Sequence, residues 1–207
     1  LSLLIALALG LAGAVALLSR SALARGVALA YTTVIRAVPD LVMMLLVFYG
    51  GQILVNELGD RLGWDYVEID AFVAGFVTIG VIFGAYFTEP FRGAFQSVPA
   101  GQLEAGAAYG MSRWQVFARI LFPQMLRFAL PGIGNNWLVL LKSTAIVSMI
   151  GPADMTWVAD QAGRSTREPF LFYMVVCVLY LLMTAASGRV LDWLTRRYNV
   201  GVRASVL

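Results

Sequence analysis

The chain has 207 residues, of which 60% are hydrophobic and only 13% are charged, and its formal net charge is +3. Because several stretches of about 18 residues carry no charge, this composition excludes a soluble domain and indicates a membrane protein. The sequence contains no histidine and a single cysteine. A disulfide within the chain is therefore excluded, and neither a structural zinc site nor histidine-based catalysis is expected.

Five apolar segments, taken in chain order, predict membrane-spanning helices. They lie at about residues 1–19, 41–56, 71–88, 128–153 and 169–188. Each is close to the ~20 residues that a helix needs to cross the hydrocarbon layer. We therefore expect an all-α membrane protein with five transmembrane helices in a single domain, residues 1–207. The first segment starts at Leu1 inside an apolar run, so we expect the natural N-terminus to lie further upstream.

Basic residues gather on one side of the predicted spans. Eleven of the 15 follow the first, third or fifth span: Arg20, Arg25, Arg36, Arg92, Arg113, Arg119, Arg127, Arg189, Arg196, Arg197 and Arg203. Arg61, Arg164 and Arg167 lie on the other side, where the segment 56–70 also carries five acidic residues. The positive-inside rule then predicts that the side with eleven arginines, including the C-terminus, is cytoplasmic.

The longest cytoplasmic connection contains two short predicted helices, which together we call the elbow (about residues 97–123). The first helix should end at Gly110, because glycine readily adopts the left-handed conformation that ends helices. Ser112 and Gln115 have the spacing of a capping box, which should open the second helix. Pro123 is expected to limit the far end of that second helix.

The elbow also places small residues beside charged ones. Ala105 and Gly106 would let the surface of another protein approach closely, with Glu104 and Arg113 as charged contacts at the rim. From the residues alone, a docking site for another protein and a loop that only caps the helix bundle are equally open alternatives.

The stretch "EAGAAYGMSRWQVFARILFP" resembles the EAA motif of the permease subunits of bacterial ABC importers. The positions that match in identity and spacing are Glu104, Ala105, Gly110, Ile120 and Pro123. Gly106 replaces the third residue of the motif and Phe122 replaces a leucine, which are mild departures. The resemblance implies the fold of a type I importer permease. It also implies that the elbow is a coupling helix, with Arg113 on its surface, which docks on a cytoplasmic ATP-binding subunit.

Three further stretches, at 31–50, 84–105 and 130–151, are similar to permeases of the polar amino-acid group. They most closely resemble the Q-type subunit of histidine and lysine/arginine/ornithine importers, while opine importers stay the alternative. The resemblance implies an inner-membrane location and a complex with a second, M-type permease, two ATP-binding subunits and a periplasmic amino-acid-binding protein. ATP and Mg would lie on the ATPase partner, since this chain has no phosphate-binding loop. No catalytic residue, metal, cofactor or nucleic-acid partner is expected for the chain itself.

Five polar residues of the fourth predicted span are candidates for lining the substrate path. Lys142 lies where an unpaired charge costs several kcal/mol, so we expect it to face a polar cavity, a partner subunit or an acid. The others are Asn135, Asn136, Ser143 and Thr144. Their alternative role is to form hydrogen bonds between helices or back to their own helix.

Three acidic residues complete the path candidates. Asp154 and Asp160 follow the outer end of the fourth span and could attract a cationic side chain, with exposed loop carboxylates as the alternative. Glu89 ends the third span, where an ion pair at the membrane boundary is the alternative to a substrate contact. By the same reasoning, Asp40 is expected to pair with Arg36.

Two functions of other classes stay open on the residues alone. An ion-coupled secondary transporter should show internal repeats and several ionisable groups within the membrane, whereas Lys142 is the one clear case here. A structural scaffold predicts no contact with an ATPase. Co-purification with an ATP-binding subunit would separate both from an importer.

Overall fold

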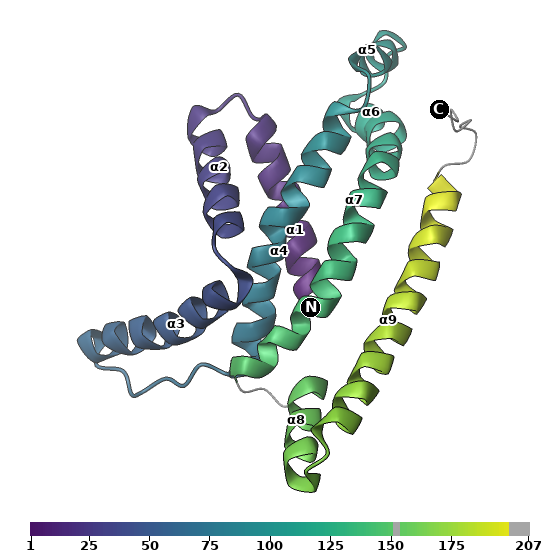
Figure 1. Cartoon of the computed structure of the whole chain (residues 1–207). Helices are drawn as coiled ribbons and strands as arrows, with labels where there is room; N and C mark the ends of the chain where they lie inside the picture. The colour runs from purple at the N-terminus through teal and green to yellow at the C-terminus, as the bar shows by residue number, and fades with distance from the viewer. Residues whose placement is uncertain (151–153, 199–207) are drawn as a thin grey trace.

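The computed structural model describes residues 1–150 and 154–198, and all regular structure in this part of the chain is helical. The α-helices are α1 (Ser2–Leu18), α2 (Ala22–Ala37), α3 (Asp40–Leu62), α4 (Ala71–Gln96), α5 (Ala100–Ala108), α6 (Arg113–Val116), α7 (Phe122–Ser143), α8 (Met155–Thr166) and α9 (Pro169–Tyr198). A π-helical turn, η1 (Phe117–Leu121), joins α6 to α7, and a 3₁₀ helix, η2 (Thr144–Ile150), follows α7. Figure 1 shows their arrangement.

Within the described residues, each predicted span lies on helical structure, the fourth on α7 followed by η2. Among the described residues, four helical stretches are long and apolar enough to cross a membrane: α3, α4, Arg113–Ser148 and α9. Helix α1 is also apolar but has only 17 residues. The all-α membrane fold is therefore confirmed, whereas the number of five crossings stays a prediction.

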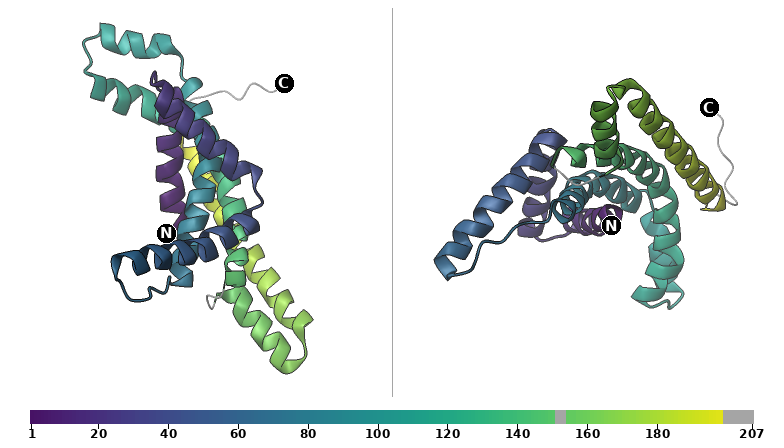
Figure 2. Two further views of the ribbon diagram at one scale, coloured as in Figure 1. Left: turned by 90° about the vertical axis from the view of Figure 1, so that its left-hand side faces the viewer. Right: turned by 90° about the horizontal axis from the view of Figure 1, so that it is seen from below.

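The core lies where α1 packs along α4. A Cβ on Gly10 or Gly13 of α1 would come within 2.5 Å of the side chain of Phe87 or Thr88 of α4, respectively. This close approach leaves Phe87 and Thr88 fully buried. It makes α4 the central helix, while α3 extends away from the α1–α4 pair (Figure 2).

Helix α2 was not predicted from the sequence, because Arg25 and Arg36 interrupt its apolar residues. Its first turn is capped by Ser21, whose hydroxyl accepts a backbone N–H at 3.3 Å. The hydroxyl of Tyr31 donates a hydrogen bond to the carbonyl of Val81 in α4. Tertiary contacts with α4 therefore support this helix, which has no long charge-free run of its own.

The fourth predicted span changes its geometry midway. Helix α7 ends at Ser143, and the 3₁₀ helix η2 begins at Thr144. The hydroxyl of Thr144 donates to the carbonyl of Leu141 at 2.7 Å. Such a bond competes with the regular helical ladder and favours a tighter turn. The last part of the predicted span, 151–153, lies outside the described residues.

The expectation that Pro123 ends the second elbow helix is wrong. Helix α6 continues through η1 into α7, so that Arg113–Ser148 is one helical stretch. In the π turn, the N–H of Phe122 bonds to the carbonyl of Phe117, five residues back. This wider turn relieves the crowding that the proline ring would cause against the carbonyl of Arg119 in a regular helix.

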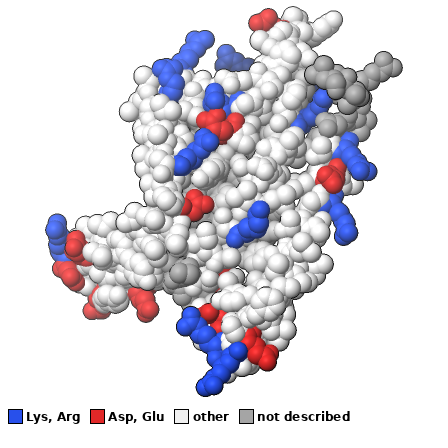
Figure 3. Space-filling model, in the orientation of Figure 1, with Lys and Arg blue, Asp and Glu red and all other residues white. Residues whose placement is uncertain are grey.

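The two ends of the molecule differ in their elements and charges. The elbow helices α5 and α6 lie at one end together with the α1–α2 turn and the end of α9, whereas α8 lies at the other (Figure 1). Acidic side chains gather at the far end of α3 (Figure 3). This arrangement fits the predicted alternation of the spans. The C-terminal residues 199–207 lie outside the described part of the chain.

Candidate functional site

The turn of the elbow is set by Gly110. This residue has a φ of 78°, the left-handed conformation predicted for it. Its N–H bonds to the carbonyl of Ala107 at 3.0 Å, and the N–H of Met111 bonds to the carbonyl of Gly106 at 3.1 Å. These two bonds satisfy the last carbonyls of α5 and turn the chain back towards α6.

Ser112 opens the second arm of the elbow. Its backbone N–H donates to Oε1 of Gln115 at 2.8 Å, and the N–H of Gln115 donates to Oγ of Ser112 at 3.3 Å. The predicted capping box is therefore confirmed. Because the turn is built from local hydrogen bonds, its shape does not require a partner chain.

The motif residues of the elbow divide into a buried contact and an exposed surface. Gly106 is buried, and a Cβ on it would come within 2.6 Å of Cδ1 of Ile120. This contact holds α5 against η1. The other residues assigned to coupling are all exposed: Glu104, Ala105, Gly110, Arg113 and Pro123.

Two large aromatic side chains on the elbow were not singled out from the sequence. Tyr109 is 90% exposed and Trp114 is 71% exposed. The ring of Trp114 stacks on that of Phe117 with a centroid distance of 5.5 Å. Exposed aromatic groups beside small residues are typical of a surface that another protein covers. The position of Tyr109 directly before the turn glycine was the available signal.

A cavity of about 1180 Å³ lies between the start of α4, the end of α7 and α9. Three carboxylates line it, from Glu68, Asp70 and Asp154, and none of the described lining residues is lysine or arginine. The aromatic residues in its wall are Phe48, Phe72, Phe76 and Tyr180. Such a lining attracts cations and provides ring faces for them. No cluster of described residues has the composition of a metal site.

Two of the predicted path residues line this cavity, namely Asp154 and Thr144. Oδ1 of Asp154 accepts the N–H of Trp157 at 2.8 Å and so caps α8. The hydroxyl of Thr144 lies 3.3 Å from that of Tyr180 in α9. Glu68 and Asp70 were missed as lining residues, because the sequence indicated only an acidic outer loop.

The carboxylate of Asp160 forms hydrogen bonds with two other side chains of this chain. Its carboxylate accepts hydrogen bonds from Nε of Arg164 at 2.8 Å and from the hydroxyl of Tyr173 at 2.9 Å. The hydrogen bond from Tyr173 is the main cause that lowers the pKa of the Asp160 carboxyl below its usual value, and the hydrogen bond and positive charge of Arg164 lower it further. Asp160 therefore links α8 to α9, and its contact with a substrate stays a prediction.

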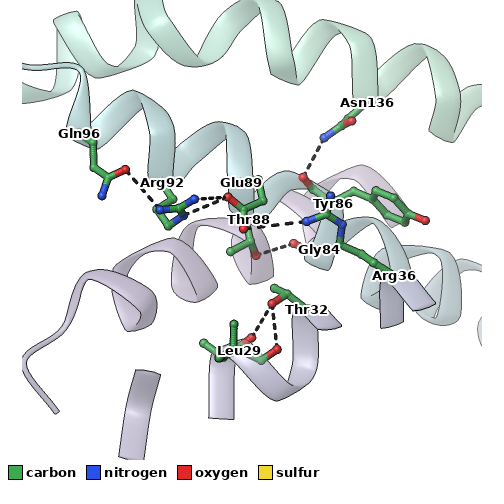
Figure 4. A network of polar contacts seen from close by, with 11 residues as sticks. Leu29, Thr32, Arg36, Gly84, Tyr86, Thr88, Glu89, Arg92, Gln96 and Asn136 are labelled. Atoms are coloured by element: carbon green, nitrogen blue, oxygen red, sulfur yellow. Dashed lines mark hydrogen bonds and ion pairs between the residues drawn. The ribbon is translucent and has the colours of Figure 1, made fainter. Parts of the chain in front are cut away.

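Glu89 belongs to a charged network between α2 and α4 (Figure 4). Arg92 donates to one of its oxygens at 2.7 and 3.0 Å, and Nη1 of Arg36 lies 3.9 Å from the other. The ion pair considered for Glu89 is therefore present. The expected pair of Arg36 with Asp40 is wrong, because Arg36 at the end of α2 turns towards α4 whereas Asp40 begins α3.

The remaining path candidates lie along α7. Asn136 Nδ2 donates to the carbonyl of Tyr86 at 3.0 Å, which is a hydrogen bond between helices (Figure 4). Asn135 is exposed and Ser143 is half-buried. Lys142 is exposed and has no ion-pair partner among the described residues. The polar surrounding expected for Lys142 stays a prediction.

Comparison with known proteins identifies the family. Residues 5–200 match the family model described as the inner membrane component of binding-protein-dependent transport systems. The chain belongs to this family. The histidine/lysine/arginine/ornithine transport system permease protein HisQ of Escherichia coli (strain K12) is 52% identical to it over 206 residues, which cover 100% of this chain and 90% of the relative.

Two further comparisons agree with this family. The octopine transport system permease protein OccQ of Rhizobium meliloti is 39% identical, over 98% of this chain and 86% of the relative. A solved structure described as an amino acid ABC transporter with histidines matches with a TM-score of 0.77 and 33% identity, covering 95% of this chain and 86% of that one. The permease fold implied by the elbow motif is confirmed. Family membership decides against a secondary transporter and a structural scaffold.

Proposed function

We propose that this chain is the transmembrane permease subunit of an ATP-driven importer of basic amino acids. The observation that carries the substrate class is the cavity lined by Glu68, Asp70 and Asp154 without a described basic residue. In partly wet surroundings, a carboxylate a few ångströms from a guanidinium or ammonium group attracts it by ~1–4 kcal/mol. The name of HisQ of Escherichia coli, 52% identical, refers to substrates of the same class.

An importer of opines is the second candidate, because OccQ of Rhizobium meliloti is 39% identical to this chain. An opine adds a second carboxylate to an amino acid. The acidic lining of the cavity would repel that group, and the identity to the opine permease is lower than the identity to HisQ. Both observations favour basic amino acids.

The elbow is the proposed docking site for a cytoplasmic ATP-binding subunit. Its exposed small residues, its match to the coupling motif and the exposed rings of Tyr109 and Trp114 support this role. ATP and Mg are bound by two copies of that subunit, which also serve a second permease of the M type. The elbow end then faces the cytoplasm of a bacterial cell, and the cavity end faces the periplasmic binding protein.

Substrate would cross the inner membrane by alternating access. Closure of the ATP-binding subunits moves the elbow, and α4 and α7 follow because the elbow connects them. A change in the packing of these two helices exposes the substrate path first to one side and then to the other. The energy comes from the partner chains, and this chain supplies the path.

Uptake by the reconstituted complex tests the proposal. Vesicles with both permeases and the ATP-binding subunits would receive binding proteins matched to basic amino acids or to octopine, in separate reactions. We expect ATP-dependent uptake of arginine, lysine and histidine, with at least about a tenfold preference over octopine. Faster uptake of octopine would indicate an opine importer, and uptake that needs no ATP would contradict the proposed function.

A further inference from the structure

The two helices that carry the elbow meet at a proline. Pro90 lies inside α4 and Pro131 lies inside α7. A Cβ on Gly132 would come within 2.7 Å of Cβ of Pro90, so the backbone of α7 touches the ring of Pro90 directly. Helices bend preferentially at internal prolines, because one helical hydrogen bond is missing there. The contact therefore joins α7 to the point where α4 bends most easily.

Pro90 also frees a carbonyl group of its own helix. In an α-helix the carbonyl of Tyr86 would accept the N–H of residue 90, which proline lacks. Asn136 supplies the missing donor from α7, through its Nδ2 at 3.0 Å (Figure 4). Asn136 follows Gly132 by one helical turn, so both residues lie on the same side of α7. One face of α7 thus contacts the proline and also satisfies the carbonyl that the proline frees.

This hydrogen bond is partly buried, with buried apolar residues beside it on both helices and Arg36 over the ring of Tyr86 at 5.7 Å from its centroid. On α7, Ala129 and Leu140 on either side of Asn136 are buried, and on α4 Phe87 next to Tyr86 is buried. At membrane depth water is not available to replace a lost donor. Loss of the Asn136 amide would therefore leave the carbonyl of Tyr86 without a partner.

We propose that Asn136 is a positioning residue for coupling: it holds the carbonyl freed by Pro90 and thereby fixes the bend of α4 against α7. The two helices then move as a pair when the elbow moves. This inference rests on the proposed function of the elbow. In this role the amide of Asn136 binds the backbone of α4 and does not contact a transported substrate. Gln161 on α8 is an exposed amide outside the substrate-path candidates and serves as the comparison.

Four variants of the complete reconstituted complex test this role. Asn136→Leu keeps a similar shape but cannot donate, and should lower transport per ATP hydrolysed about fivefold without changing the substrate concentration for half-maximal transport. Pro90→Ala restores an N–H opposite the Tyr86 carbonyl. When Pro90→Ala is already present, adding Asn136→Leu should therefore lower transport per ATP hydrolysed only slightly. Gln161→Leu, the same amide-to-leucine change at an exposed position on α8, is the matched control and should leave coupling unchanged.

Thermal unfolding of the same complexes gives a second measurement that does not depend on transport. Asn136→Leu should lower the Tm by about 3–6 °C, and by less than half as much when Pro90→Ala is also present. Equal losses in both backgrounds would overturn the inference. A changed half-maximal substrate concentration with intact coupling would do so as well. A wild-type complex without transport would contradict only the proposed function, because the thermal comparison still tests the contact.

Discussion

The turn of the elbow depends on the left-handed conformation of one residue, Gly110, which has a φ of 78°. A Cβ added to Gly110 would meet no other atom within 4 Å. Gly110→Val should cost about 1 kcal/mol or more, because a β-branched residue is strained in the left-handed region. We expect ATP hydrolysis to continue while transport falls, measured together in vesicles. Gly110→Asn is the matched control, since asparagine tolerates this conformation and should retain coupling. Unchanged coupling in the valine variant would contradict the role of the turn.

Asp154 allows the charge of the cavity to be changed without loss of a helix cap. Asn also caps helices, so Asp154→Asn keeps the bond to Trp157 and removes only the charge. We expect the half-maximal arginine concentration to rise about tenfold and that of histidine to rise less, because histidine is mostly uncharged near pH 7. Asp65→Asn, in the outer loop, is the control. An equal loss for both substrates would instead indicate a role in folding or gating.

The crossing of α1 and α4 depends on glycine at the contact. Gly10→Ala would place a Cβ 2.5 Å from Cβ of Phe87, and should destabilise the fold by about 1–3 kcal/mol. Gly26→Ala on α2 is the matched control, because nothing lies within 4 Å of its added Cβ. It should be neutral or stabilise by about 0.5–1 kcal/mol. Thermal unfolding of the purified complex measures both, and equal stability of the two variants would count against this packing.

The pairing of α8 with α9 through Asp160 predicts a defined pH dependence. The pKa of the folded-state Asp160 carboxyl is lowered below its ordinary value of 3.8, so its contribution to stability is complete above that value and disappears as the pH falls through the folded pKa. The difference in Tm between wild type and Asp160→Asn should therefore be constant from pH 8 to pH 5 and shrink below about pH 4. A difference that already shrinks between pH 8 and pH 6 would contradict the assignment.

At the scale of the elements, the sequence predicted features that arise within a few neighbouring residues. It did not predict features that depend on contacts between distant segments. The apolar runs located the spans, and Gly110 and the Ser112–Gln115 pair located the turn, because the causes lie within a few neighbouring residues. Helix α2 was missed because contacts with α4 support it. The prediction that Pro123 ends the second elbow helix was wrong because a π turn accommodates the proline ring.

The orientation of the whole molecule can be tested by labelling. In a Cys177→Ser background, Tyr66→Cys in the loop between α3 and α4 and Tyr109→Cys on the elbow provide one thiol at each end, since both tyrosines are highly exposed. An impermeant reagent added to intact cells with a permeabilised outer membrane should label the first variant only. Labelling of the elbow variant from outside would reverse the proposed orientation.

The cavity illustrates what the sequence could not predict at this scale. Glu68 and Asp70 are far from Asp154 in the chain, and the packing of α4 with η2, and of η2 with α8, brings all three to the same cavity. Charge counts could predict an acidic outer side but not a shared cavity. Asp154 lines this cavity, and its role in the substrate path stays a prediction, while Asp160, six residues later, lies in the contact with α9.

The ion pair between Arg36 and Glu89 has a consequence for how the chain enters the membrane during synthesis. Arg36 in α2 finds its acid only in α4, with all of α3 made in between. The pair cannot form before α4 has emerged from the ribosome, so α2 gains this contact only after two further helices have been made. The packing of α2 against α4 would therefore be a late step of assembly.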